Sequence, residues 1–312
     1  MLRAQHADLS SFVRAWMTAG GLLAGLVVTL ALVMGGPASG QEAVPGTYPT
    51  AGLKTLPTFD TPPNRLIRPA APALKGSGLA VLWPGTRFRS DAIRTAEEDW
   101  TLNPGRLWYQ QGARSWQEAA DKGSPTCATC HNAAAFSMRG VSLRYPRRHP
   151  RFDRNITLQD RINLCRTDHM DQRAIPYDDD AMLALTTYVR RQSLWMTIDE
   201  RIERASQDNV AAGELFFRTK RGDAQLSCAD CHETGFGQPY RGMVVSQGQP
   251  VAFPSYTASL GRPISLHAQF QRCQQLVGDR PLPTGAQAYT DLELYLRRRS
   301  AGLPVMTPGV RP

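Results

Sequence analysis

The chain has 312 residues, and its 36 lysines and arginines outnumber its 27 aspartates and glutamates, which gives a net charge of +9 at pH 7. Such an excess suits small anionic substrates or acidic partners, because it steers their approach. Nucleic acid is a poor candidate partner, since no recognition motif occurs in the sequence. Most of the arginines at 147–148, 190–191 and 297–299 are interpreted as solvated surface.

The first 40 residues have the order of a secretory signal peptide. Two arginines precede an uncharged apolar run from Gly20 to Met34, and residues 38–40 are all small. We therefore predict a signal peptide over 1–40, cleaved before Gln41. The apolar run is short for a transmembrane span, so an uncleaved anchor is the weaker alternative.

The remaining length, about 270 residues, suits two modest domains. Proline and glycine are frequent from 41 to 76, which predicts an extended arm. The fold class is expected to be mostly α, with two tandem haem modules of the cytochrome c type at 77–206 and 207–312. Hydrophobic periodicity and charges at the helix ends predict helices in both modules, over 105–119, 178–192, 211–218 and 290–299.

Each module contains one C-x-x-C-H pentad, either Cys127-Ala-Thr-Cys130-His131 or Cys228-Ala-Asp-Cys231-His232. This spacing is typical of haem c, in which two cysteines form thioethers with the haem and the histidine binds its iron. A zinc site needs four converging ligands, and a thioredoxin-like pair needs no following histidine. The pattern predicts two covalently bound haems c. Because bacteria attach haem c outside the cytoplasmic membrane, the predicted location is the periplasm.

One further cysteine follows each pentad, Cys165 in the first module and Cys273 in the second. Thiolate is a known second axial ligand of haem iron, which predicts the ligand pairs His131/Cys165 and His232/Cys273. A Cys165–Cys273 disulfide is the alternative that an oxidising compartment would favour. Methionine is the commoner sixth ligand, but the following residues do not recur at equivalent places and are mostly expected in the core: Met138, Met170, Met182, Met196 and Met243.

Several stretches around the pentads occur in a specific order: Asn103-Pro-Gly105 with Leu107-Trp108, Met182-Leu-Ala-Leu185, Gly213-Glu-Leu-Phe216, Lys220-Arg-Gly222, Leu226-Ser-Cys228, Gly235-Phe-Gly237, Ser246-Gln-Gly248, Phe253-Pro254, Ser265-Leu-His267 and Phe270-Gln-Arg-Cys273. With these motifs, the chain resembles the SoxA family, the dihaem c-type subunit of the SoxAX complex of bacterial sulfur oxidation. The resemblance covers most of the chain after the predicted signal peptide.

The resemblance implies an enzyme, an L-cysteine S-thiosulfotransferase. It would join thiosulfate oxidatively to a cysteine of the SoxYZ carrier and pass electrons to a small c-type cytochrome. The implied partner is SoxX, a monohaem cytochrome c that forms a heterodimer with SoxA. In the family, the cysteine that corresponds to Cys273 is both haem ligand and sulfur site, whereas Cys165 would be a haem ligand only.

The residues around Cys273 agree with an anionic substrate. Arg272 is adjacent, and the flanking loops offer Lys220, Arg221, Arg241 and Arg262. A haem propionate is an equally good partner for Arg272. Many members of the family carry arginine four residues before the cysteine, whereas this chain has Gln269, so another arginine must compensate or the substrate preference differs.

Glycines in the loop before Cys273 are expected to let a partner's arm approach closely; they are Gly235, Gly237, Gly242 and Gly248. Two other functions remain open. One is a related dihaem thiosulfate dehydrogenase that forms tetrathionate, and the other is a dihaem electron carrier without catalysis. A reactive axial thiolate argues against the carrier.

Overall fold

The computed structural model describes residues 72–73, 75–119 and 122–312. The predicted signal peptide and nearly all of the predicted arm lie outside the described residues. Helices are the main regular elements of the described residues, as predicted for a mostly α fold, and none of them combines the length and the apolarity needed to cross a membrane. The α-helices are α1 (Asp91–Glu98), α2 (Arg106–Gln117), α3 (Cys127–His131), α4 (Ala134–Ser137), α5 (Leu158–His169), α6 (Asp180–Arg191), α7 (Gln207–Arg218), α8 (Leu266–Leu276) and α9 (Gln287–Arg299).

Short elements connect these helices. The 3-10 turns are η1 (Gly85–Phe88), η2 (Val141–Arg144), η3 (Arg204–Ser206) and η5 (Ala258–Leu260), and η4 (Asp230–Thr234) is a π-helical turn. Two antiparallel pairs join β1 (Arg147–His149) to β2 (Arg154–Ile156) and β3 (Pro239–Tyr240) to β4 (Met243–Val244). A third sheet has the order β6 (Arg262–Ile264), β5 (Ser255–Thr257), β7 (Gly309–Arg311), with β5 antiparallel to β6 and parallel to β7.

All four predicted helices are present, with shifted starts. The helix predicted from 178 begins at Asp180, because the Asp179 carboxylate caps it by accepting a hydrogen bond from the Ala181 amide at 2.8 Å. Asp178 instead accepts a hydrogen bond from the Ser265 amide at 2.9 Å, far along the chain. The helices predicted from 211 and 290 begin earlier, at the starts of α7 and α9.

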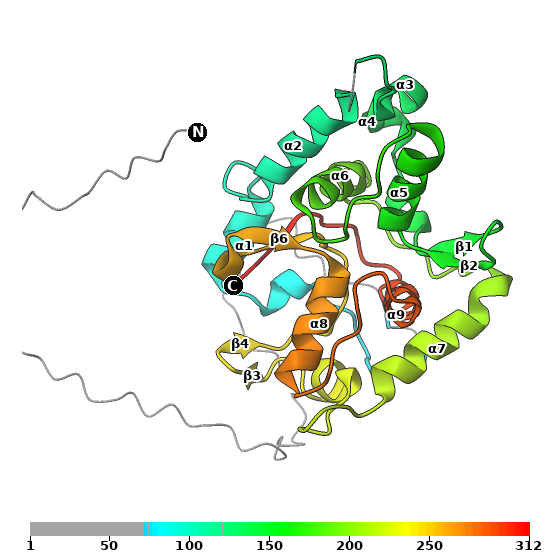
Figure 1. The fold of residues 1–312 in the computed structure, drawn as a ribbon. Coiled ribbons are helices and arrows are strands. Elements are labelled where there is room, and N and C mark those ends of the chain that lie inside the picture. The colour runs from blue at the N-terminus through cyan, green and yellow to red at the C-terminus, as the bar shows by residue number, and fades with distance from the viewer. Residues whose placement is uncertain (1–71, 74, 120–121) are drawn as a thin grey trace, which may run out of the picture. The chain divides into compact units, whose positions relative to one another are not determined.

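The same helix crossing occurs in both modules, with α2 packed on α6 and α7 packed on α9 (Figure 1). At each crossing a glycine faces backbone. A Cβ atom on Gly112 would lie 2.2 Å from the Ala184 carbonyl oxygen, and one on Gly213 would lie 2.1 Å from the Asp291 carbonyl oxygen. Real Cβ atoms do not approach so closely, so glycine sets the distance between the two crossing helices of each module.

Separate clusters of apolar side chains stabilise the modules. Trp116 and Leu158 belong to the cluster beside α3, and Phe217 and Tyr289 to the one beside the second pentad. The C-terminal segment joins a third cluster with Leu82 and Leu303, both fully buried. It also ends in an ion pair between Arg311 and Glu97 at 2.7 Å. The end of the chain is therefore fastened to α1.

Replacing Gly213 by alanine should lower the free energy of unfolding by about 1–3 kcal/mol, because the new methyl group overpacks the crossing of α7 and α9. The measurement is denaturant unfolding of the haem-loaded protein. Gly85→Ala is the matched control, since its nearest neighbour would lie at an ordinary 3.4 Å. Equal stabilities of the two variants would contradict the packing argument.

Candidate haem and sulfur site

Both pentads begin in a turn held by reciprocal capping. In the first, Thr126 and Thr129 each accept a hydrogen bond from the other's backbone amide, at 3.0 Å in both cases. In the second, the Ser227 hydroxyl accepts from the Asp230 amide at 3.1 Å, and the Asp230 carboxylate accepts from the Ser227 amide at 2.8 Å. These caps satisfy amides at the start of the turn and fix the two cysteines and the histidine on it.

The lone cysteines also lie on equivalent helices, Cys165 on α5 and Cys273 on α8. Each helix follows a short strand and a hydroxyl cap, in the repeated sequence Arg154-Asn-Ile-Thr-Leu158 and Arg262-Pro-Ile-Ser-Leu266. Each cysteine comes seven residues after the leucine that ends its repeat. The sequence analysis missed this repeat, although alignment of the two lone cysteines reveals it.

The structure brings each lone cysteine to the pentad of its own module. Burial, followed by the charge of Cys165, raises the pKa of the Cys127 thiol. Burial likewise raises the pKa of the Cys228 thiol to about 12, and Cys273 is the largest electrostatic contributor to that rise. All six cysteines are free, so the alternative Cys165–Cys273 disulfide is not formed.

The imidazole of His232 is oriented by the loop that follows η4. Its Nδ1 lies 2.7 Å from the Ser246 carbonyl oxygen, which can only accept, so Nδ1 carries the proton and Nε2 keeps a free lone pair. Burial, opposed by the hydrogen bond to Ser246 and aided by the charge of Arg299, lowers the pKa of His232 to about 4. A neutral imidazole of this tautomer is the form that binds iron.

Gly248 is required by the same histidine. It has a φ of +76°, and a Cβ atom there would lie 2.9 Å from Cγ of His232. A Cβ atom on Gly235 would similarly lie 2.9 Å from the carbonyl oxygen of Asp230 in the pentad. Both glycines thus permit close packing around the pentad within the chain, whereas Gly242 has open space around it. That the glycines of this loop let a partner approach stays a prediction.

The first pentad is oriented differently. His131 lies against the indole of Trp116, with ring centroids 5.9 Å apart, and the Trp116 Nε1–H donates to the Asn132 carbonyl at 2.9 Å. Cys127 packs against the apolar cluster of its module, and Cys228 does the same in the second. Two thiols, a histidine and a nearby lone thiol, set against apolar side chains, fit haem c in both modules.

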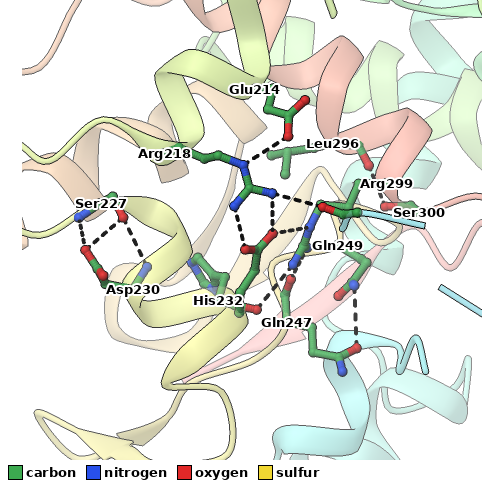
Figure 2. Close-up of polar contacts among 12 residues, drawn as sticks. Glu214, Arg218, Ser227, Asp230, His232, Gln247, Gln249, Leu296, Arg299 and Ser300 are labelled. Atoms are coloured by element: carbon green, nitrogen blue, oxygen red, sulfur yellow. Dashed lines mark hydrogen bonds and ion pairs between the residues drawn. The ribbon is translucent and has the colours of Figure 1, made fainter. Parts of the chain in front are cut away.

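A buried ion-pair network surrounds the second pentad (Figure 2). Glu233, the residue after the histidine, has an 8% exposed side chain and pairs with Arg218 at 2.8 Å and with Arg299 at 3.5 Å. Arg299, the last residue of α9, also donates to the carbonyl oxygens of His232, at 3.3 Å, and of Gln247. Glu233 therefore ties the pentad to the ends of both α7 and α9.

This network corrects the interpretation of the arginine clusters. The side chain of Arg299 is only 1% exposed, and that of Arg297 donates to the carbonyl oxygens of Leu143 and Arg201. Neither is a solvated surface charge. The sequence offered one signal for the network, since a glutamate stands directly after the second pentad, where the first has Asn132.

Cys273 has two close polar neighbours on its own helix. The Gln269 Nε2 lies 3.3 Å from its Sγ, so the side chain at position 269 faces the sulfur. Burial raises the pKa of the Cys273 thiol, while the hydrogen bond from Gln269 and the charge of Arg272 lower it. Arg262 does not compensate for the neutral glutamine, because it pairs with Asp180 at 2.7 Å. Arg221 stacks on Phe216, 3.8 Å from the ring centroid.

Two C-x-x-C-H pentads on a repeated helical scaffold define the class of protein as a c-type cytochrome. The family model described as SoxA/TsdA, cytochrome c domain, matches twice, over 111–198 and 212–305. The predicted modules, 77–206 and 207–312, contain these ranges, and their bounds stay predictions.

Similar proteins narrow the class. The chain is 33% identical to the L-cysteine S-thiosulfotransferase subunit SoxA of Pseudaminobacter salicylatoxidans, over 73% of this chain and 80% of the relative. It is 29% identical to the subunit SoxA of Rhodovulum sulfidophilum, over 93% and 99%. A crystal structure of SoxXA from P. pantotrophus superposes with a TM-score of 0.75 at 26% identity, covering 79% of this chain and 94% of that one. The chain belongs to the SoxA family.

Glu233→Gln should lower the free energy of unfolding by about 3 kcal/mol, because it leaves the buried guanidinium of Arg299 without its counter-charge. The variant to compare is Glu214→Gln, which removes an exposed ion pair of the same Arg218 and should cost less than about 1 kcal/mol. Denaturant unfolding of the haem-loaded proteins measures both. A cost for Glu233→Gln no larger than that of the control would show that the buried pair contributes little.

Proposed function

We propose that this chain is the dihaem catalytic subunit of an L-cysteine S-thiosulfotransferase. The reaction joins the terminal sulfur of thiosulfate to the thiol sulfur of a carrier cysteine. One S–S bond forms, the S–H bond breaks, and one proton and two electrons leave. We infer that the carrier is SoxYZ and that the electrons reach a small c-type cytochrome.

The observation that carries this proposal is the position of Cys273. It lies on α8 beside Cys228 of the second pentad, with Arg272 and Gln269 as its polar neighbours. Membership of the SoxA family and the names of the similar curated proteins support the activity.

The residues of the chain divide the work. Haem c supplies an electron acceptor and an iron that keeps a bound thiolate deprotonated. Cys273 supplies the sulfur that handles the substrate, because thiolate is the nucleophilic form of cysteine. Arg272 is exposed beside it and attracts the thiosulfate dianion. His232, held by Ser246, and Cys273 would hold the iron of the second haem, and His131 and Cys165 would hold that of the first.

The proposal extends to partners and location. SoxX, a monohaem cytochrome c, is the proposed heterodimer partner, since the similar solved structure is of SoxXA. After removal of residues 1–40 the protein would work in the periplasm, where haem c is attached.

A second candidate function is that of a tetrathionate-forming thiosulfate dehydrogenase. The observation in its favour is that the description of the matching family model includes TsdA as well as SoxA. The two functions differ in their product. The first gives thiosulfate bound to a carrier cysteine, and the second gives free tetrathionate. A turnover assay that measures both products with and without SoxYZ decides between them.

The purified protein should carry two covalent haems, on Cys127/Cys130 and on Cys228/Cys231. Mass spectrometry of the denatured protein should therefore show the mass of two haems on a chain that begins at Gln41. Cys228→Ser with Cys231→Ser should retain one haem. A single haem on the unsubstituted protein, or haem removed by acid–acetone extraction, would contradict the prediction.

Cys273→Ser should reduce turnover by roughly a hundredfold or more, because it removes the reacting sulfur. Cys165→Ser is the matched control in the first module and should keep much of the activity. The assay contains SoxX, SoxYZ and a cytochrome acceptor, with haem counts of each variant as a check of folding. Substantial activity of a haem-loaded Cys273→Ser protein would remove this residue from the mechanism.

A further inference from the structure

The sulfur of Cys273 receives a hydrogen bond from a neutral side chain. Gln269 lies one helical turn before it on α8, and its Nε2 is 3.3 Å from Sγ, within the range for a hydrogen bond to sulfur. A thiolate is an acceptor only, so the NH2 group of Gln269, and not its side-chain oxygen, must face the sulfur.

The backbone of α8 holds this contact in place. The Ser265 hydroxyl caps the helix by accepting from the Ala268 amide at 3.1 Å, and Phe270 is buried in the apolar cluster of the module. The position of Gln269 on the helix is thus determined on both sides of it. Its own side chain is half-buried, so the hydrogen bond is partly protected from solvent.

The first module has a different residue at the equivalent place. Arg161 lies four residues before Cys165, as Gln269 lies four residues before Cys273. Its positive charge lowers the pKa of the Cys165 thiol, against the larger raising effect of burial. One lone cysteine therefore has a cation one turn away, and the other has a neutral donor in direct contact.

The remaining cation near Cys273 cannot replace this hydrogen bond. Arg272 is exposed, so water and salt screen its charge. A hydrogen bond to a ligand sulfur withdraws electron density from it, weakens its donation to the metal and stabilises the reduced state. The direct N–H contact is thus the interaction best placed to adjust the sulfur.

We propose that Gln269 is a positioning residue that sets the electron donation of the Cys273 thiolate through its N–H···S hydrogen bond. The second haem then has a higher reduction potential than an unbonded thiolate would give it. This inference rests on the proposed function, in which Cys273 is the axial ligand of the second haem.

The test compares two glutamines of α8 in the haem-loaded protein. Gln269→Leu removes the donor to sulfur, whereas Gln271→Leu removes a donor to the Leu282 carbonyl, at 2.7 Å, on the same helix. Electron paramagnetic resonance and spectroelectrochemistry record each haem separately. Gln269→Leu should lower the potential of the second haem and shift its low-spin signal, with the first haem unchanged. Gln271→Leu should move neither haem.

Further variants check the direction of the change in reduction potential. Gln269→Glu keeps the shape, removes the donor and adds a negative charge, so it should lower the second potential further. Gln269→Arg restores an N–H donor and adds a positive charge, so it should raise the potential above that of the unsubstituted protein and lower KM for thiosulfate several-fold. Arg161→Gln should move only the first haem.

Equal potentials and signals for Gln269→Leu and Gln271→Leu would overturn the inference, as would a shift confined to the first haem. Cys273→Ser separates this failure from failure of the proposed function. If that variant changes the second low-spin signal while Gln269→Leu does not, only the role of Gln269 falls. If it leaves the signal unchanged, Cys273 is not the ligand and both fall.

Discussion

The close approach of two helix pairs determines the architecture of this protein. Glycine at the crossings of α2 with α6 and of α7 with α9 brings backbone against backbone, and no other residue fits there without displacing a helix. The pentad and the helix of the lone cysteine lie between the two crossing helices in the chain order of each module. The distance between the crossing helices therefore limits where the pentad histidine and the lone cysteine of each module can lie.

On this shared scaffold the two modules differ in polarity. The second has the buried carboxylate of Glu233 beside the pentad, with Arg218 and Arg299 around it, and the Ser246 carbonyl on its histidine. The first has an indole against its histidine and an asparagine after it. An ion-paired and hydrogen-bonded surrounding suits the module whose cysteine is proposed to react, because a precise geometry needs support from neighbouring residues.

Several arginines of this basic chain form structural contacts. Arg299 stabilises a buried carboxylate, Arg262 pairs with Asp180, and Arg297 binds backbone carbonyls of distant segments. Among the residues that the structure describes, Arg272 is the cation whose charge lowers the pKa of the Cys273 thiol. Because Gln269 is neutral, one exposed arginine and one hydrogen bond are the two interactions that lower the pKa of the Cys273 thiol.

The class of protein could be identified from the sequence, which also predicts the residues that would carry its chemistry. The pentads are local motifs, and the four predicted helices follow from periodicity and capping, so short stretches of chain contain the information. The lone cysteines were paired with their pentads because their order repeats. Tertiary structure alone decided which arginines are buried, that Arg262 pairs with Asp180 rather than facing the sulfur, and that Gly235 and Gly248 pack against the haem-binding turn. Those outcomes depend on contacts between segments distant in the sequence, because burial decides whether a charged residue or a glycine has a structural role.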